Sequence, residues 1–528
     1  MPSRPGHRAW RRYSRRGVTG LVAVLAPLLV AACTVGPSAT PSLVVAGSQP
    51  TTPSPTGSNG PLPLPGLEHS TGQVGWSDCT DETTGRLGSP APPSGMTFQC
   101  AHLIAPIDPS DTDDSSGDQR ISLLKVGNGP TPLVVVNDLD GLPGTLYAAR
   151  LAAALPAQFL STFSLIGMDR RGTAGSSGVH CVPQVDRNTM IESDPATTNL
   201  TSVLNASTDA SQQCVLALSS TMALFDTKNT VADLELVRQS LGVSHLDAIG
   251  HGEGSRVLTS YAGQYPAHVG RFVLDGAPDP QLSTEDAAQA QAAGAQATFT
   301  AFAQNCVATN CPLGADPTGA VNQLLSTVRQ APMPANGIQL TAGIVLRAIV
   351  TGLADRSQWG ALATDLQQAI GGDGTGLTGL IGPELTGTPQ DPPQIDADLV
   401  SGCNDVPDRL SPGQVGNDVR SWAGKAPLFG ALYAENLLLC GPWPVPTQPL
   451  PKPTAPGTPP ILVISTASDP VTPQAGTQRV AQLLDSGVLL TWAGAGHGAL
   501  GQSSCATSAA QNFLIGGRVP ASGTACPA

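Results

Sequence analysis

The stretch Leu246–Arg256, LDAIGHGEGSR, decides the fold. Its first half is a short apolar run of the kind found in buried β-strands. Three glycines at alternate positions follow, and Ser255 to Tyr265 then have the pattern of a helix. Glycines at this spacing predict a tight turn, because two backbones that approach closely leave no room for Cβ atoms. The stretch therefore predicts a strand that passes through a sharp turn directly into a helix.

This turn has the spacing of the nucleophile elbow of α/β-hydrolases, G-x-S-x-G, which exposes a serine hydroxyl at the end of a sheet strand. The five residues here are Gly250, His251, Gly252, Glu253 and Gly254. The outer glycines are in place, but the position that should carry the serine is Gly252. The sequence therefore predicts the frame of a serine hydrolase without its nucleophile.

Short apolar runs alternate with helical patterns along much of the chain. Strands are expected at 120–126, 132–137, 163–169, 245–249, 271–275, 461–465 and 488–492, and helices at 146–155 and 230–241. This alternation predicts the α/β-hydrolase fold, with a mostly parallel central sheet flanked by helices. Between residues 280 and 459, helical stretches rich in Ala and Gln predict a helical cap inserted between sheet strands, over the edge where ligands bind.

The N-terminus has the organisation of a targeting segment. A cluster of arginines precedes an apolar stretch, Val18–Val30, that is too short to span a membrane. Val30-Ala31-Ala32-Cys33 then resembles a bacterial lipobox, in which Cys33 is lipid-modified. An ordinary signal peptide cut near Ala32 is the alternative. We expect an exported protein, either a lipoprotein held on the outer face of the cell membrane through Cys33 or a protein secreted or placed in the cell wall.

Five segments follow from these patterns. We expect a lipoprotein signal peptide at 1–33, a disordered Pro/Ser/Thr/Gly tether at 34–72, the first part of the core at 73–280, the cap at 281–459 and the C-terminal part of the core at 460–528.

Eleven cysteines are present, and setting Cys33 aside leaves an even number, which suits disulfides formed in an oxidising compartment. Their spacing suggests that neighbours pair, although sequence alone leaves the connectivity open. The suggested pairs are Cys79–Cys100, Cys181–Cys214, Cys306–Cys311, Cys403–Cys440 and Cys505–Cys526.

The charge and the motif content limit the partners. The net charge is −13. The segment before Cys33 is rich in arginine, so the net charge of the rest of the chain is more negative still. This argues against nucleic acid as a partner. We expect a peptide or protein ligand under the cap and membrane attachment only through the lipid on Cys33. Because no zinc-type spacing of Cys or His is present, we expect no metal and no cofactor.

Two members of a catalytic triad are recognisable. Asp469, in STASDPVTP, follows the strand expected at 461–465, and His497, in GAGHGAL, follows the strand expected at 488–492. In α/β-hydrolases the order along the chain is nucleophile, acid, histidine. Asp469 and His497 have this order, and each lies on a loop at the carboxyl end of a strand. They are the expected acid and base.

From about Ile121 to the C-terminus the chain resembles the actinobacterial tripeptidyl-aminopeptidase family, which are secreted serine peptidases of the prolyl-aminopeptidase type. The resemblance is carried by FSLIGMDRRGTAGSS, TVADLELVRQSLG, QYPAHVGRFVLDGAPDP, GCNDVP, CGPWP, SDPVTP and GHG. It implies that Asp469 and His497 are the acid and the base and that Thr472 supports the acid. It also implies substrates with a free amino terminus, cut three residues in.

Three departures from the family lie at the reaction centre. Gly252 replaces the serine, so no acyl-enzyme forms there. The residue that gives one oxyanion-hole amide is Glu253, whose charge opposes a developing oxyanion. The loop that resembles N-G-G-P-G in the family here runs from Asn137 to Gly144, is longer, and contains two acids, Asp138 and Asp140. We expect Glu253, Asp138 and Gly141 to line the oxyanion or substrate site.

Three hypotheses follow. The first is a peptide- or partner-binding protein with little or no serine-peptidase activity. The second is an active peptidase that acts from the N-terminus of peptides through His497 and Asp469 with an unusual nucleophile, such as Ser255, or a water molecule. Ser176 and Ser177 are expected to be turn residues. The third is a cation or amine site, formed by Asp138, Asp140, Glu253, Asp469, His251 and His497.

Overall fold

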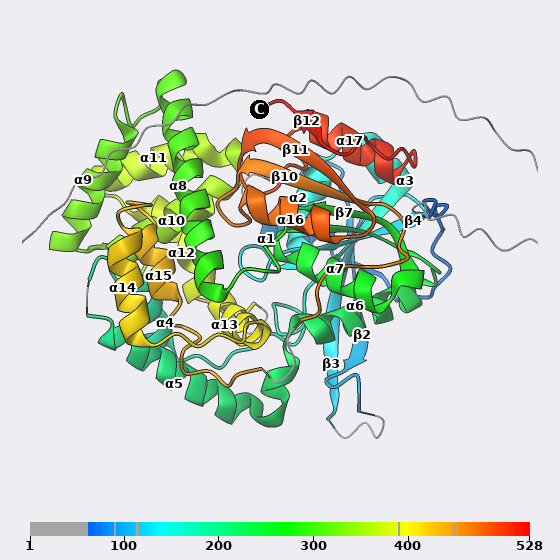
Figure 1. The fold of residues 1–528 in the computed structure, drawn as a ribbon, viewed down its shortest axis with the longest axis horizontal. Helices are drawn as coiled ribbons and strands as arrows, with labels where there is room; N and C mark the ends of the chain where they lie inside the picture. Colours follow the sequence, from blue (N-terminus) through cyan, green and yellow to red (C-terminus); the bar gives the residue numbers. More distant parts are fainter. Residues whose placement is uncertain (1–61, 89–90, 112–115, 198, 389–390, 447–449) are drawn as a thin grey trace, which may run out of the picture. The chain divides into compact units, whose positions relative to one another are not determined.

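A ten-stranded sheet organises the computed structural model, which describes residues 62–88, 91–111, 116–197, 199–388, 391–446 and 450–528. Within these residues the strand order is β1-β2-β3-β5-β4-β6-β7-β10-β11-β12. Strands β1, β2 and β3 pair antiparallel, β3 pairs antiparallel with β5, and every later pairing is parallel. The mostly parallel sheet of an α/β-hydrolase is therefore confirmed (Figure 1).

The strands of this sheet are β1 (Ser77–Asp78), β2 (Phe98–Pro106), β3 (Asp118–Val126), β4 (Thr131–Val136), β5 (Phe163–Met168), β6 (Leu246–His251), β7 (Val269–Asp275), β10 (Ile461–Ser468), β11 (Gly487–Ala495) and β12 (Thr524–Cys526). The helices around it are α1 (Thr80–Leu87), α2 (Gly144–Ala154), α3 (Ala157–Thr162), α6 (Thr227–Leu241), α7 (Glu253–Gln264), α16 (Gln474–Leu483) and α17 (Ser504–Leu514).

Both faces of the sheet are covered by helices. Strands β4, β5, β6 and β7 are buried along their whole length, as their continuous apolar runs predict. Side chains of α2, α3 and α17 form one apolar layer with one face of the sheet, and side chains of α6, α7 and α16 form the other. This arrangement leaves the carboxyl ends of the parallel strands free to carry a site.

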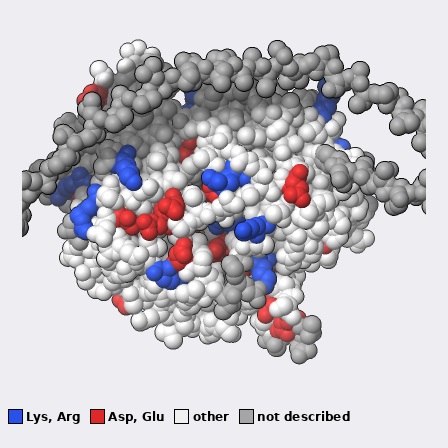
Figure 2. Space-filling view, viewed as in Figure 1, with Lys and Arg blue, Asp and Glu red and all other residues white. Residues whose placement is uncertain are grey.

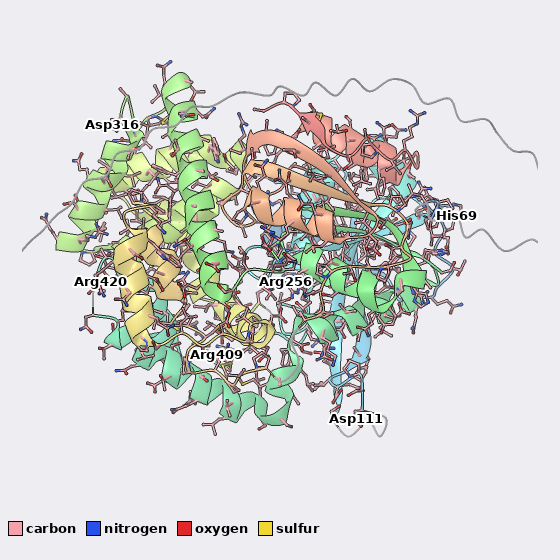
Figure 3. All side chains as sticks on the ribbon, in the orientation of Figure 1. His69, Asp111, Arg256, Asp316, Arg409 and Arg420 are labelled. Carbon is pink, nitrogen blue, oxygen red and sulfur yellow. A yellow bond between two sulfur atoms is a disulfide. The ribbon has the colours of Figure 1, made fainter. Side chains whose placement is uncertain are left out.

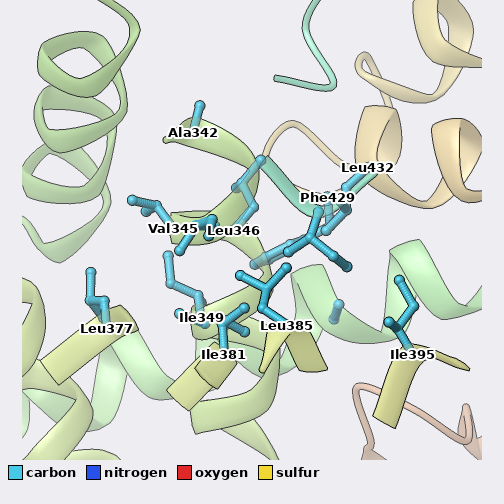
Figure 4. Packing of buried hydrophobic residues seen from close by; sticks show 14 of the residues in the cluster. Ala342, Val345, Leu346, Ile349, Leu377, Ile381, Leu385, Ile395, Phe429 and Leu432 are labelled. Carbon is cyan, nitrogen blue, oxygen red and sulfur yellow. The ribbon is translucent and has the colours of Figure 1, made fainter. Parts of the chain in front are cut away.

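A helical cap is inserted between β7 and β10. It contains α8 (Thr284–Ala308), α9 (Pro317–Gln330), α10 (Ala342–Ala354), α11 (Trp359–Ile370), α12 (Thr375–Leu385), α13 (Gln394–Asp405), α14 (Pro412–Trp422) and α15 (Gly430–Asn436), with a small hairpin of β8 (Met333–Ala335) and β9 (Ile338–Leu340). Residues of α10, α12 and α13 pack against Phe429 and Leu432 to form its core (Figure 4).

Two helices that precede the cap in sequence belong to the same apolar cluster. Residues of α4 (Gln184–Glu192) and α5 (Thr201–Leu218) are buried with the cap helices, and both helices lie beneath the cap in Figure 1. From the sequence, residues 73–280 were all predicted to belong to the core. The difference arises because the apolar side chains of α4 and α5, such as Met190 and Cys214, contact the cap and not the sheet.

The segment predicted as the end of the tether contacts the core. The Gly72 amide donates to the Leu241 carbonyl, and Glu68 pairs with His245 at 2.7 Å. Arg271 donates to the carbonyl of Pro65 at 2.9 Å. Residues 62–72 are thus held by backbone and ionic contacts that their Pro-rich composition did not predict. The predicted signal peptide, Cys33 and the rest of the tether lie outside the described residues.

All five suggested disulfides are present: Cys79–Cys100, Cys181–Cys214, Cys306–Cys311, Cys403–Cys440 and Cys505–Cys526. Charged side chains are sparse and of mixed sign on the face in Figure 2. Among the described helices, none combines the length and apolarity that a bilayer span requires.

Candidate active site

The predicted sharp turn follows β6. Gly252 has φ 54° and ψ −120°, a left-handed conformation that favours glycine, and α7 begins at the next residue. The outer glycines allow close packing, since a Cβ on Gly254 would lie 2.0 Å from the Val136 carbonyl oxygen. A Cβ on Gly250 would lie 2.8 Å from the Ser255 backbone. The backbone of a nucleophile elbow is therefore retained although the serine is absent.

The predicted acid and base lie together at the carboxyl ends of β10 and β11. Nδ1 of His497 lies 3.0 Å from Oδ1 of Asp469, and both residues are buried. The Thr472 hydroxyl and the Gly498 amide also donate to the Asp469 carboxylate, at 2.9 and 3.2 Å. These donors fix the carboxylate, which in turn orients the imidazole.

Asp138 fills the space beside Gly252. Its Oδ2 lies 3.0 Å from Nε2 of His497, and its Oδ1 accepts the amide hydrogen of Glu253 at 2.7 Å. A Cβ placed on Gly252 would lie only 2.0 Å from Oδ1 of Asp138. We expected Asp138 and the Glu253 amide to line an oxyanion site. In a serine hydrolase, this amide would bind the oxyanion and this imidazole nitrogen would contact the serine hydroxyl. Here the carboxylate of Asp138 contacts both groups.

The two carboxylates control the charge of His497. Burial opposes the imidazolium, but the charges of Asp469 and Asp138 and their hydrogen bonds raise the pKa of His497 well above its ordinary value. Burial likewise acts to raise the pKa of Asp138 and of Asp469, but the charge of His497 outweighs it and lowers both. The two carboxylates therefore favour the imidazolium form of His497, which can donate a hydrogen bond to each of them.

His251 completes this group. Its ring stacks on Tyr147 with centroids 4.7 Å apart and lies 4.2 Å from the ring of His497. Nε2 of His251 is 3.7 Å from Asp138, and Nδ1 is 3.8 Å from Oδ2 of Asp275. Asp275 is held in turn by the amides of Ala499 and Leu500 at 2.8 and 2.9 Å.

A second group of acids lies between this site and the cap. The side chains of Asp140 and Asp398 are partly accessible to solvent, but much of their surroundings is protein. The resulting desolvation, together with the charges of neighbouring carboxylates, raises the pKa of each. The pKa of Asp398 reaches about 7. Glu253 and Glu384 are among those neighbours, and Arg170 lies 3.6 Å from Glu253. Carboxylates that raise each other's pKa favour a cationic ligand between them.

A cleft of about 540 Å³ is lined by chain neighbours of three of these acids: Leu139 and Gly141 flank Asp140, Pro383 precedes Glu384, and Ala397 precedes Asp398. Its walls are the loop that follows β4, the loop that follows β5, and the cap segment between α12 and α13. Gly141, expected at the substrate site, lies in this wall, and its carbonyl accepts a hydrogen bond from Gln394 of α13. Arg256, labelled in Figure 3, extends from α7 to within 4.0 Å of Asp405 of the cap. The site therefore lies where core and cap meet.

The other candidate serines have structural roles. The buried hydroxyl of Ser255 donates to the carbonyls of Gly250 and Gly276. The hydroxyl of Ser176 donates to the Asp169 carbonyl at 2.7 Å, and that of Ser177 accepts the Arg120 amide at 3.0 Å. The ring nitrogens of His497 contact Asp469 and Asp138, and none of these hydroxyls.

Sequence reasoning missed Tyr147, which stacks on His251, and Asp275, which lies 3.8 Å from Nδ1 of His251. It also missed the cap acids Asp398 and Glu384. Asp275 ends a buried strand, which is a signal that could have found it. The cap acids lie on helices, where charged residues are ordinarily solvated, so the sequence did not indicate that they lie near Asp140 and Glu253.

The mostly parallel sheet, the sharp turn after β6 and the His–Asp pair after the later strands define an α/β-hydrolase. Within that class, a family model described as "TAP-like protein" matches residues 426–526. Residues 426–526 are therefore TAP-like, in a chain that has the α/β-hydrolase fold.

Three curated relatives are similar over most of their length. The serine protease Hip1 of Mycobacterium tuberculosis is 29% identical over 455 residues, which cover 81% of this chain and 87% of the relative. Carboxylesterase B of the same organism is 27% identical over 459 residues, covering 81% and 86%. The tripeptidyl aminopeptidase of Streptomyces lividans is 24% identical over 488 residues, covering 86% of each chain.

Proposed function

We propose that this protein is an exported TAP-like α/β-hydrolase that binds a peptide, or the end of a partner protein, beneath its cap and has little or no serine-peptidase activity. The observation that carries the proposal is the position of Asp138. Its carboxylate contacts both His497 and the Glu253 amide, at 3.0 and 2.7 Å, beside a residue that has no side chain.

Loss of covalent catalysis follows from this geometry. A triad needs a hydroxyl in hydrogen-bond contact with the imidazole and free amides for the oxyanion. Here Gly252 supplies no hydroxyl, and the carboxylate of Asp138 contacts both the imidazole of His497 and the Glu253 amide. An incoming carbonyl oxygen would meet the negative charge of Asp138 where it needs a hydrogen-bond donor. Removal of a triad nucleophile alone lowers kcat by several orders of magnitude.

The acids under the cap support a ligand with a cationic end. Asp140, Asp398 and Glu384 lie near a cleft that is large enough for several residues of peptide. A protonated amino terminus placed among them would relieve the repulsion that raises their pKa values. The relatives named serine protease and tripeptidyl aminopeptidase are consistent with a peptide as the ligand class.

Export is part of the proposal. The five disulfides of the described residues suit an oxidising compartment. The arginine-rich start, the apolar stretch and Val30-Ala31-Ala32-Cys33 supply the targeting signal, with a lipid on Cys33 as the membrane anchor. Mass spectrometry of the membrane fraction tests this by showing a diacylated Cys33 peptide or an unmodified one.

The activity is tested with a fluorophosphonate probe and with tripeptide substrates on the purified full-length chain. We expect no labelled serine and no turnover above that of the His497→Ala variant. Robust labelling at one serine, or turnover that His497→Ala abolishes, would contradict the proposal.

Ligand binding is tested by calorimetry with a mixed library of short peptides, used once with free and once with acetylated amino termini. We expect binding of the free form only and at least a tenfold loss in Asp398→Asn. Asp316→Asn is the matched control, because Asp316 is an exposed cap residue remote from the cleft (Figure 3). Equal binding of both libraries would refute recognition of the amino terminus.

A further inference from the structure

Three buried side chains meet beside the position of the missing serine. Asp138, His251 and His497 each offer one metal-ligating atom, and these atoms all lie within 4.8 Å of one another. Each residue is only 8% exposed. We propose that Asp138, His251 and His497 form a binding site for a divalent transition-metal ion, of which zinc matches the ligands best.

The spacing of the ligand atoms fits such an ion. Bonds from zinc to imidazole nitrogen and carboxylate oxygen are about 2.0–2.2 Å long, so two ligands of a tetrahedral site lie roughly 3.4 Å apart. Oδ2 of Asp138 lies 3.0 Å from Nε2 of His497 and 3.7 Å from Nε2 of His251, on either side of that value. The ring centroids of the two histidines lie 4.2 Å apart, and the three ligand atoms lie within 4.8 Å of one another.

Each ligand also has the outer partner that metal sites use. Nδ1 of His497 lies 3.0 Å from Asp469, which orients the ring so that Nε2 points away from that carboxylate and toward Asp138. The Glu253 amide holds Oδ1 of Asp138 and leaves Oδ2 for the metal. Oδ2 of Asp275 lies 3.8 Å from Nδ1 of His251, within reach of a hydrogen bond after a small shift.

An unpaired nitrogen gives independent support. Nδ1 of His251 is buried and has no hydrogen-bond partner among the residues that the structure describes, whereas buried polar atoms are ordinarily paired. The ring is nevertheless fixed in place by stacking on Tyr147. With a metal ion on Nε2, the neutral ring carries its hydrogen on Nδ1, on the side of Asp275, and metal-bound histidines commonly donate this hydrogen to a carboxylate.

The ligand set selects the class of metal. Two imidazoles and one carboxylate with an open position are typical of zinc and related transition metals, whereas calcium and magnesium prefer oxygen ligands alone. Gly252 has no side chain beside Asp138, so no Cβ restricts the space around the ion. The proposal does not depend on peptide binding, because it concerns only the metal and these three ligands.

The test is a calorimetric titration of the chelator-treated full-length chain with Zn²⁺ alone. We expect one ion per chain, a loss of affinity of about 100-fold or more in His251→Gln and in His497→Gln, and a loss of roughly 10–100-fold in Asp469→Asn, which removes an outer partner. His180→Gln, at an exposed histidine, is the matched control and should bind as the wild type does.

X-ray absorption at the zinc edge of the wild-type protein provides a measurement that needs no variant. We expect nitrogen and oxygen ligands with two imidazoles and no sulfur. A wild type that binds no zinc, a spectrum with fewer than two imidazoles, or unchanged affinity in both histidine variants would overturn the proposal.

Discussion

Asp138 and His497 are 359 positions apart in the chain, yet Oδ2 of Asp138 lies 3.0 Å from Nε2 of His497. The contact depends on a third residue, because any side chain at position 252 would occupy the same space. The position of Asp138 in the loop after β4 therefore requires glycine at position 252 in the turn after β6. A glycine alone would leave an imidazole without a partner, and an acid alone would clash with a serine.

This coupling predicts that Gly252→Ser by itself does not restore a hydrolase. The new Cβ would lie 2.0 Å from Oδ1 of Asp138, and that carboxylate is held by two hydrogen bonds. We expect the variant to lose about 1–3 kcal/mol of stability through overpacking and to remain unlabelled by a fluorophosphonate. Urea unfolding and labelling in gel provide the two measurements.

The double variant Asp138→Gly with Gly252→Ser should behave differently. It removes the clash, frees the Glu253 amide and places a hydroxyl beside His497. We expect fluorophosphonate labelling at residue 252, in contrast to the single variant. Adding His497→Ala to the double variant should abolish labelling. Equal labelling of the single and double variants would show that Asp138 does not block the site.

Most of the fold was predictable from local sequence. Buried parallel strands are continuous apolar runs, and the sharp turn needs glycines at fixed positions, so β4, β6 and α7 were predicted to within a few residues. The pairing of Asp469 with His497 was predictable because each follows such a strand. Residues 62–72 and the helices α4 and α5 were misassigned, because their packing depends on which distant surface they contact.

The role of Asp138 could not be read in the same way. Sequence placed it on the correct loop, but whether its side chain lines an oxyanion site or occupies the serine position depends on the loop's conformation. Packing of Gly254 against the Val136 carbonyl brings this loop and the turn after β6 together, and that contact is visible only in three dimensions.

A buried ion pair holds the loop that forms one cleft wall. Arg171 donates to both oxygens of Asp233, at 2.8 and 2.7 Å, and both side chains are almost inaccessible. We expect Asp233→Ala to cost about 3–5 kcal/mol, because it leaves a buried guanidinium unpaired. Breaking the exposed pair of Arg86 and Asp391 with Asp391→Ala should cost no more than about 1 kcal/mol. Similar losses in urea unfolding would contradict this ranking.

We expect the contribution of Asp247 to the free energy of unfolding to fall as the pH rises. Burial outweighs the Arg271 amide and charge and raises the pKa of Asp247 to about 6 in the folded state, against an ordinary value near 4. Between pH 4 and pH 6 the folded state therefore retains a proton that the unfolded state releases. Folding consequently loses up to about 2–3 kcal/mol across this range through Asp247. Asp247→Asn cannot titrate, so its free energy of unfolding relative to the wild type should increase by that amount from pH 4 to pH 7. Urea midpoints at unit steps of pH give the measurement, and parallel curves for the wild type and Asp247→Asn would show that Asp247 titrates normally.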